Sequence, residues 1–363
     1  MSRPHPAPIP PDLYGRPRAD RYFRFMERLM GVYLPLTTAR DGYGRRPAVQ
    51  ERPHRLTVAR RRMVAEDVVS LRLVEPAGRL LAPWQPGAHL DLRLPSGRQR
   101  QYSLAGDPAD RYAYTVAVRL IPDGAGGSAE VHRELTEGSR VDVRGPRNAF
   151  PFAADRSVLL LAGGIGITPV LPMAREAAWR GLDWRLVHTG RTRASLPFAG
   201  ELDRLARRHP GRVEILTDDE HGVPDAAALL ARAPEGAAVY CCGPAPMLAA
   251  VQRAFDASGL RALHFERFGA APIVDGKPFT LRLRDGRELP VPADESALDV
   301  LRADNPATPY SCRQGFCGVC KVRVRSGAVE HRDRKLTPRQ RADGEMLVCV
   351  SRAAEGACLE LDV

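Results

Sequence analysis

Apolar and polar residues alternate in short segments between about residue 53 and residue 152. Gly and Pro separate these segments, which are HRLTVARRRMV, VVSLRLVEP, AHLDLRLPSG, RYAYTVAVRL and SRVDVRGP. A period of two with evenly spaced turn residues is typical of strands that bury one face. The pattern predicts a small antiparallel β-barrel over residues 53–152.

The pattern changes after residue 152. Continuous apolar segments appear, and stretches with helical periodicity such as VLPMAREAAWR and PMLAAVQRAFDASG follow them; the apolar segments are SVLLLAGGIGITP, WRLVHTG, RVEILTD and AAVYCCGP. Alternation of strand and helix is typical of a parallel sheet covered by helices. We therefore assign residues 153–270 to a parallel α/β domain.

A third pattern follows the Gly- and Pro-containing linker GAAPIVDGKP at 269–278. PFTLRLRDGRELPV predicts a hairpin closed on Asp285-Gly286, SALDVLRADN predicts a short helix, and KVRVRSGAV predicts a strand. Residues 271–363 are assigned to a third domain. No internal repeat is visible along the chain.

The first 52 residues are rich in Pro and Arg. One helix is expected from Arg21 to Leu34, with Asp20 before it and Pro35 after it. The helix is basic, so two interpretations stay open: an arm that packs on the body, or a segment that docks on a partner or an anionic membrane.

Charge is concentrated in this arm. The 363 residues carry a formal net charge of +11, and residues 1–50 alone hold nine Arg against four acids. The rest of the chain is nearly balanced, and only three lysines occur. No nucleic-acid-binding module is visible. No apolar run is long enough to span a membrane and no secretory signal opens the chain, so we expect a cytoplasmic protein.

Seven cysteines in such a chain indicate metal or redox use rather than disulfides. Three of them have the spacing C-x4-C-x2-C, at Cys312, Cys317 and Cys320, and Cys349 lies 29 residues further on. This spacing matches the plant-type 2Fe-2S pattern better than the paired C-x2-C of structural zinc sites. Gly315 and Gly318 would let the loop wrap a cluster and direct amide N–H groups at sulfur. Cys358 is expected to be a core thiol.

The segment SVLLLAGGIGITP combines a strand, a glycine turn and a helix start. Gly164 and Gly166 would let the backbone approach a pyrophosphate, although the turn ends in Thr168-Pro169 and departs from G-x-G-x-x-G. A second apolar strand leads to Cys242-Gly243-Pro244, where the thiol could lie beside a nicotinamide ring or could be buried and inert. For Cys241 the buried, inert role is expected.

Two further segments offer groups that suit a flavin. In RQYSL (100–104) an Arg can pair with a phosphate, an aromatic ring can lie on a ring, and a Ser hydroxyl can bond a flavin nitrogen. DGAGGS (123–128) could form a phosphate-binding nest of N–H groups or a flexible loop. Either segment alone is also compatible with ordinary structure.

Taken in order, these motifs resemble the phthalate dioxygenase reductase family within the ferredoxin-NADP reductase superfamily. The resemblance covers residues 53–363 and includes PRNAF (146–150) and HFERFG (264–269). It implies an antiparallel flavin-binding β-barrel, a parallel α/β nicotinamide-binding domain and a β-grasp 2Fe-2S ferredoxin domain. The arm departs from the simplest members of the family.

The resemblance also implies cofactors and roles. The flavin would be FMN, with Arg100 on its phosphate, and Ser103, Thr168 and Cys242 would lie where nicotinamide meets flavin. The iron ligands would be Cys312, Cys317, Cys320 and Cys349. The expected cofactor-binding residues are Arg100, Tyr102, Ser103, Leu104, Gly126, Gly127, Ser128, Gly164, Gly166, Thr168, Arg191, Arg193, Cys242, Gly243, Pro244 and Phe268.

The expected activity is an NAD(P)H-dependent reductase that passes single electrons to a separate protein. NADH and NADPH both stay open, because Arg191 and Arg193 could meet a 2′-phosphate or belong to a solvated loop. The expected partner is a Rieske-type ring-hydroxylating or demethylating oxygenase, with a haem-thiolate monooxygenase as the alternative. A monomer is expected, and a redox sensor without turnover is a further possibility.

Overall fold

The computed structural model describes residues 53–122, 126–153, 156–270, 273–333 and 335–363. The chain divides into two compact units, Met1–Glu51 and Arg52–Val363, and the second unit is described below. The helix expected over 21–34 lies outside the described residues. No helix in the described ranges is long and apolar enough to cross a membrane.

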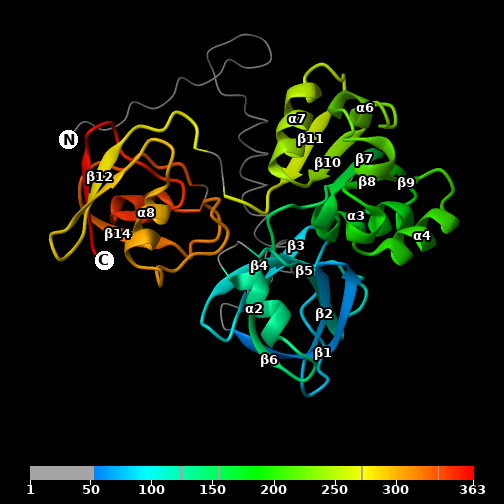
Figure 1. The fold of residues 1–363 in the computed structure, drawn as a ribbon, viewed down its shortest axis with the longest axis horizontal. Coiled ribbons are helices and arrows are strands. Elements are labelled where there is room, and N and C mark those ends of the chain that lie inside the picture. The colour runs from blue at the N-terminus through cyan, green and yellow to red at the C-terminus, as the bar shows by residue number, and fades with distance from the viewer. Residues whose placement is uncertain (1–52, 123–125, 154–155, 271–272, 334) are drawn as a thin grey trace, which may run out of the picture. The chain divides into compact units, whose positions relative to one another are not determined.

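The alternating segments form a six-stranded antiparallel sheet with the order β4-β3-β6-β1-β2-β5 (Figure 1). An isolated bridge between Leu104 and Val116 joins the two outer strands and closes the sheet into a barrel. Buried aliphatic side chains such as Leu56, Leu71 and Leu90 fill its interior. The elements are β1 (His54–Ala65), β2 (Val68–Val74), β3 (Ala88–Arg93), β4 (Gln99–Ser103), β5 (Ala113–Arg119), α2 (Gly127–Glu134) and β6 (Arg140–Asn148).

The strands that alternate with helices form a parallel sheet with the order β11-β10-β7-β8-β9 (Figure 1). The chain runs outward from β7 in one direction and then from β10 in the other, so the strand order reverses between these two strands. The elements are β7 (Ser157–Gly163), η1 (Gly164–Gly166), α3 (Ile167–Trp179), β8 (Asp183–Gly190), η2 (Arg193–Ser195), α4 (Ala199–Arg208), β9 (Val213–Thr217), α5 (Asp218–His221), α6 (Ala226–Leu230), β10 (Ala238–Cys242), α7 (Ala245–Phe255) and β11 (Ala262–Glu266).

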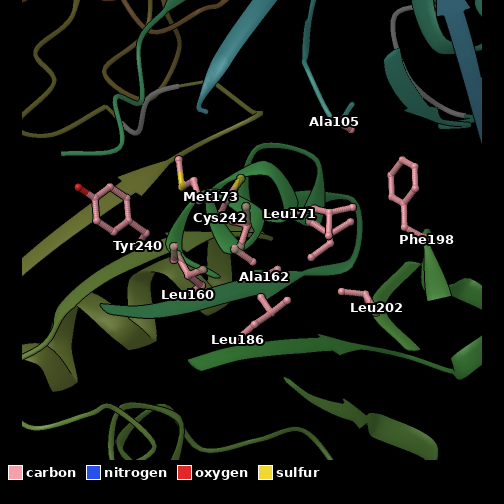
Figure 2. Close-up of a cluster of buried hydrophobic side chains, with 14 of the residues drawn as sticks. Ala105, Leu160, Ala162, Leu171, Met173, Leu186, Phe198, Leu202, Tyr240 and Cys242 are labelled. Carbon is pink, nitrogen blue, oxygen red and sulfur yellow. The ribbon is translucent and has the colours of Figure 1, made fainter. Parts of the chain in front are cut away.

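In addition to the barrel's own core, one apolar cluster joins the barrel to the parallel sheet, and part of this cluster is shown in Figure 2. Ala105 and Phe150 of the barrel segment join side chains of the sheet such as Leu160, Leu186 and Tyr240 in the same cluster. Burial of apolar surface against a common core holds two modules in one arrangement. The edge at which strand order reverses therefore keeps a fixed position next to the barrel.

The last segment forms a mixed sheet with the order β13-β12-β16-β14-β15. Its elements are β12 (Phe279–Arg282), β13 (Glu288–Val291), α8 (Ala297–Asp304), β14 (Lys321–Ser326), α9 (Pro338–Ala342), β15 (Glu345–Leu347) and β16 (Cys358–Leu361). The β12–β13 hairpin turns at Asp285-Gly286, and Gly286 has the positive φ that this turn requires. This module has its own core, which includes Leu281, Leu298 and Met346.

The expectation of a core thiol at Cys358 is wrong. This residue opens β16 and is only partly buried, whereas the neighbouring Leu359 and Leu361 are fully buried. Side chains alternate between the two faces of a strand, so Cys358 shares the more exposed face with Glu360.

Candidate functional site

Four cysteines meet in the loop between α8 and β14 and at the end of β15. Cys312 interacts with Cys317, and Cys320 with Cys349, through side-chain hydrogen bonds, and Cys312 is also within electrostatic reach of Cys320 and Cys349. Sharing of a proton within each pair lowers the pKa of one thiol, to about 6 for Cys312, and raises that of its partner. The sulfurs form two adjoining pairs, as two metal ions held by two thiolates each would require.

The described part of the chain contains no group of three or more His, Cys, Asp or Glu side chains arranged around a single ion. The four thiols lie as two pairs, Cys312 with Cys317 and Cys320 with Cys349, and a set of four thiols with this spacing fits a two-iron cluster.

Backbone amides of the loop point at the sulfurs. The amide of Gln314 lies 3.3 Å from Cys312 Sγ, and the amides of Phe316 and Cys317 also donate to this sulfur. The amide of Gly315 donates to Cys349. Such bonds stabilise thiolate charge and tune a cluster's potential.

Glycine is required at position 315. Its φ of 76° lies in the left-handed region, and a Cβ there would approach the Cγ2 of Val350 to 2.7 Å. Gly318 also has positive φ, 84°. The two glycines let the loop curve closely around the thiols, as the sequence had suggested.

The glycine turn after β7 lies against the end of β10. A Cβ on Gly166 would come within 2.1 Å of the Cys242 carbonyl oxygen, and one on Gly163 within 2.6 Å of Pro244 Cδ. Only glycine therefore allows the two strand ends to meet. The N-terminus of α3 starts at this point, where strand order reverses, so its free N–H groups can receive a pyrophosphate. The residues fit a dinucleotide.

Two buried side chains donate hydrogen bonds to backbone carbonyls of this turn. Thr168 is buried, and its hydroxyl donates to the carbonyl of Ile165 over 3.0 Å. His188 of β8 is fully buried, and its Nε2 donates to the carbonyl of Gly164 over 2.9 Å. Burial lowers the pKa of His188 to about 4, so its ring is neutral near pH 7. The sequence analysis missed His188, for which a lone His in the apolar segment WRLVHTG was the available signal.

Ser103, Cys242 and Glu266 come together from three strands. Cys242 and Glu266 are opposite each other in the β10–β11 pair, and the Ser103 hydroxyl lies 3.5 Å from Glu266 Oε2. Burial raises the pKa of Glu266 to about 8, and burial together with Glu266 raises the pKa of the Cys242 thiol. Cys242 also belongs to the apolar cluster of Figure 2. Glu266 was missed because only this long-range pairing brings it to the site.

The side chain of Arg100, a residue of β4, lies against the beginning of α2 and contacts the cysteine loop. A Cβ on Gly127 would come within 2.7 Å of Arg100 Nε, so glycine is needed for this approach. Arg100 Nη2 donates to the Tyr310 hydroxyl over 2.6 Å, and its guanidinium stacks on that ring. The N-terminus of α2 beside an arginine fits a phosphate group.

The other residues expected to bind the flavin lie in the barrel core or at the start of α2. Tyr102 packs partly buried on the barrel core, and burial raises the pKa of its hydroxyl. The amide of Ile121 donates to the Ser128 hydroxyl over 3.0 Å, which ties α2 to the start of the loop that follows β5. Residues 123–125 of this loop lie outside the described residues. Gly126 precedes α2 with positive φ. The Leu104 side chain is fully buried in the barrel core.

The remaining candidates lie at the rim of the parallel sheet. Arg193 forms an ion pair with Asp203 over 3.1 Å, and the amide of Asp219 donates to the Arg191 carbonyl. Gly243 packs on Gly163, and Pro244 precedes α7. Phe268 is 47% exposed, which suits a ring that a ligand covers. Cys241 is buried as expected, and burial raises the pKa of its thiol to about 12.

Comparison with known proteins gives two domain matches. Residues 160–253 match the oxidoreductase NAD-binding domain, and residues 281–354 match the 2Fe-2S iron-sulfur cluster binding domain. The second match contains all four cysteines of the two pairs, and the first contains the glycine turn and Cys242.

Relatives of the full length are also found. The phenoxybenzoate dioxygenase subunit beta of Ectopseudomonas oleovorans is 42% identical over 82% of this chain and 94% of its own length. The phthalate dioxygenase reductase of Burkholderia cepacia is 37% identical over 85% and 97%. A solved structure of phthalate dioxygenase reductase, described as modular for electron transfer from pyridine nucleotides to [2Fe-2S], matches with a TM-score of 0.62 at 37% identity, over 86% of this chain and 98% of that one.

A haem protein shares the same architecture. Full-length CYP116B46 of Tepidiphilus thermophilus matches with a TM-score of 0.63 and 38% identity over 90% of this chain. The chain spans only 45% of that protein.

Proposed function

Because this chain belongs to the phthalate dioxygenase reductase family, we propose that it takes electron pairs from NADH or NADPH and delivers single electrons to a separate terminal oxygenase. FMN, when bound, supplies hydride acceptance, and a 2Fe-2S cluster supplies one-electron transfer. The two pairs of thiols, three of the four buried, in a chain that also carries a dinucleotide-type turn are the observation that carries this function. The resemblance drawn from the sequence motifs is confirmed.

We propose the domain limits 53–152 for the FMN-binding barrel, 153–270 for the nicotinamide-binding domain and 271–363 for the ferredoxin domain, preceded by the arm 1–52. The strand limits support them, since β1–β6 end at Asn148, β7–β11 at Glu266 and β12–β16 at Leu361.

The residues of the turn and its neighbours would bind and orient the nicotinamide. Gly164 and Gly166 present backbone N–H groups to the pyrophosphate, and the Ser103 hydroxyl lies at the junction of barrel and sheet. Burial raises the pKa of Glu266 to about 8, and its Oε2 accepts the hydrogen bond that the Ser103 hydroxyl donates. Cys242, buried and uncharged, keeps water from the same place.

Arg100 would bind the FMN phosphate together with the N–H groups at the start of α2, and Tyr102 would line the flavin. Cys312, Cys317, Cys320 and Cys349 would hold the irons, with the amides of Gln314 and Gly315 bonded to the sulfurs. Phe268 would cover the flavin or nicotinamide.

The partner we propose is a Rieske-type ring-hydroxylating or demethylating oxygenase. The dioxygenase relatives match over more than nine-tenths of their length, and their names describe a dioxygenase subunit and a dioxygenase reductase. The haem-thiolate alternative is less favoured, because the P450 match joins this architecture to a larger protein. The protein would act in the cytoplasm, where the nicotinamide coenzymes are reduced.

An absorbance spectrum of the purified protein, with acid-released flavin identified and iron and sulfide measured, tests the proposal. We expect flavin and iron-sulfur bands, one FMN, two irons and two sulfides per chain, and bleaching by NADH or NADPH. NADH-dependent reduction of cytochrome c excludes a sensor without turnover. A colourless protein loaded with zinc would refute the proposal.

A further inference from the structure

The ferredoxin module touches the barrel segment mainly through the cysteine loop. The ring of Phe316 meets the ring of His89 edge to face, with centroids 6.0 Å apart. Tyr310 of the same loop binds Arg100. The ferredoxin core contains no side chain from the other two modules. The loop that carries three of the cysteines is therefore held by specific groups rather than by a shared core.

Arg147 of β6 lies beside these contacts. It is opposite His89 in the β3–β6 pair, and His89 is the residue that touches Phe316, which lies directly before Cys317. The Arg147 guanidinium pairs with Asp91 of β3, whose side chain is 1% exposed. Cys317 and Cys312 are within electrostatic reach of this guanidinium, and they raise the pKa of Arg147 against a larger lowering by burial.

Other charges at this place are already neutral or paired. Burial and Arg147 itself lower the pKa of His89 to about 4, so the His89 ring is uncharged near pH 7. Arg313, in the loop, is paired with Asp299 of α8. Gln99 donates to the same Asp91 carboxylate over 3.0 Å and fixes it. Arg147 is therefore paired with a buried carboxylate and also lies within electrostatic reach of the Cys312–Cys317 pair.

We propose that Arg147, a residue of the flavin-binding barrel, raises the reduction potential of the cluster that the cysteine loop holds, with Asp91 setting the position and strength of this charge. The inference rests on the proposed function, specifically on the four iron ligands. It assigns Arg147 as a positioning and tuning residue, since it acts through the cysteines.

The physical reason is electrostatic. Reduction adds one electron, supplied by the flavin after hydride transfer, and makes the cluster more negative by one charge. The Arg147 guanidinium is 28% exposed and is paired with Asp91, so the part of its positive charge that Asp91 does not balance at the cysteines favours the more negative state, and solvent screens it only in part. Because the charge belongs to the barrel, the cluster is easiest to reduce when its loop rests on the barrel, where the electron arrives.

The test is a redox titration of the holoprotein, in which the cluster is followed by electron paramagnetic resonance and the flavin by absorbance. For Arg147→Gln we expect the cluster to become at least about tenfold harder to reduce, which is a fall of about 59 mV for a one-electron couple. For Asp91→Asn we expect a shift in the opposite direction. Arg147→Lys keeps the charge and should remain closer to the wild type than Arg147→Gln.

Arg144→Gln is the matched control. Arg144 lies on the same strand and is exposed, and its replacement by Gln removes the same charge. The equilibrium constant for reduction of the cluster should therefore change less than threefold. An unchanged cluster potential in Arg147→Gln, or equal shifts in Arg147→Gln and Arg144→Gln, would overturn the inference. If Asp91→Asn does not fold, the inference is tested by the cluster reduction potentials of Arg147→Gln, Arg147→Lys and the wild type alone. A wild-type protein without a cluster signal would overturn the proposed function, and this inference with it.

Discussion

His188 Nε2 lies 2.9 Å from the carbonyl oxygen of Gly164, and this bond joins a buried strand to the glycine turn at which the parallel sheet reverses its order. A carbonyl can only accept, so Nε2 carries the proton and Nδ1 is the unprotonated nitrogen. Gly164 has a φ of 52°, which glycine adopts without steric cost. The bond fixes the direction in which the following amides point.

Replacement of His188 by Leu should raise the KM for NADH about tenfold with a smaller change in kcat, because an unmade bond to a buried carbonyl costs about 1–2 kcal/mol. Steady-state kinetics and direct titration with NADH measure the effect. His188→Gln offers an N–H near the position of Nε2 and should restore much of the affinity. If the KM for NADH rises equally in the Gln and Leu variants, the hydrogen bond from His188 does not contribute to NADH binding.

Replacement of Cys349 by Ser should remove the cluster and leave the flavin. The four sulfurs form two pairs, and loss of one ligand exposes an iron to water and oxidant. We expect iron and sulfide to fall below about one-tenth of the wild-type content, with the flavin absorbance kept. NADH would still bleach the flavin, while cytochrome c reduction would fall.

Cys358→Ser is the matched control for Cys349→Ser. Cys358 lies on the half-exposed face of β16, away from the pairs, so this variant should keep both irons and the wild-type rate. A Cys349→Ser protein with two irons and two sulfides would contradict the proposed ligand set.

Local pattern predicted the three sheets. Alternation of apolar and polar residues marks most of β2, continuous apolar runs mark β7 and β10, and the spacing of Cys312, Cys317 and Cys320 belongs to one loop. Each of these signals is local, so the residues that determine it lie within a few positions of one another.

Contacts between distant strands could not be predicted in this way. Ser103 and Glu266 are 163 positions apart in the sequence, yet their side chains are hydrogen-bonded. Asp91 and Arg147 form an ion pair between the neighbouring strands β3 and β6. His188 appeared to be one polar residue in an apolar run. Cys358 was misjudged because strand register decides which face a side chain takes, and a one-residue shift reverses it.

Glu266 should make folding stability depend on pH. Burial raises the pKa of Glu266 in the folded protein to about 8, above the ordinary value of 4.5. Relative to higher pH, the folded state is therefore favoured fully below about pH 4.5, and this part of the free energy of unfolding is lost as the pH rises through about 8. Between these values the free energy of unfolding should fall by at most about 1.4 kcal/mol per pH unit from this group. Denaturant unfolding of the holoprotein between pH 5 and pH 8 measures the slope.

Glu266→Gln cannot ionise and serves as the comparison for that slope. The variant should lose this part of the pH dependence and keep the rest. If wild type and variant show parallel curves, the carboxyl group is ionised in the folded protein at neutral pH, contrary to the raised pKa of Glu266.

The ion pair between Arg193 and Asp203 should disfavour NADPH. Arg193 lies just beyond the end of β8, where a 2′-phosphate would be bound, but Asp203 neutralises it over 3.1 Å. Asp218 and Asp219 follow β9 next to Arg191 and add negative charge. We therefore expect NADH to be the better substrate, as judged from kcat/KM measured for both coenzymes.

Asp203→Asn should raise kcat/KM for NADPH about two- to fivefold and leave NADH nearly unchanged, because an exposed ion pair is worth up to about 1 kcal/mol. The gain should disappear in the double variant Asp203→Asn with Arg193→Gln, since the freed guanidinium is what meets the phosphate. It should also shrink as salt is added, because both groups of the pair are exposed. A gain that persists without Arg193 would assign coenzyme choice to other residues, with Arg191 the first to test.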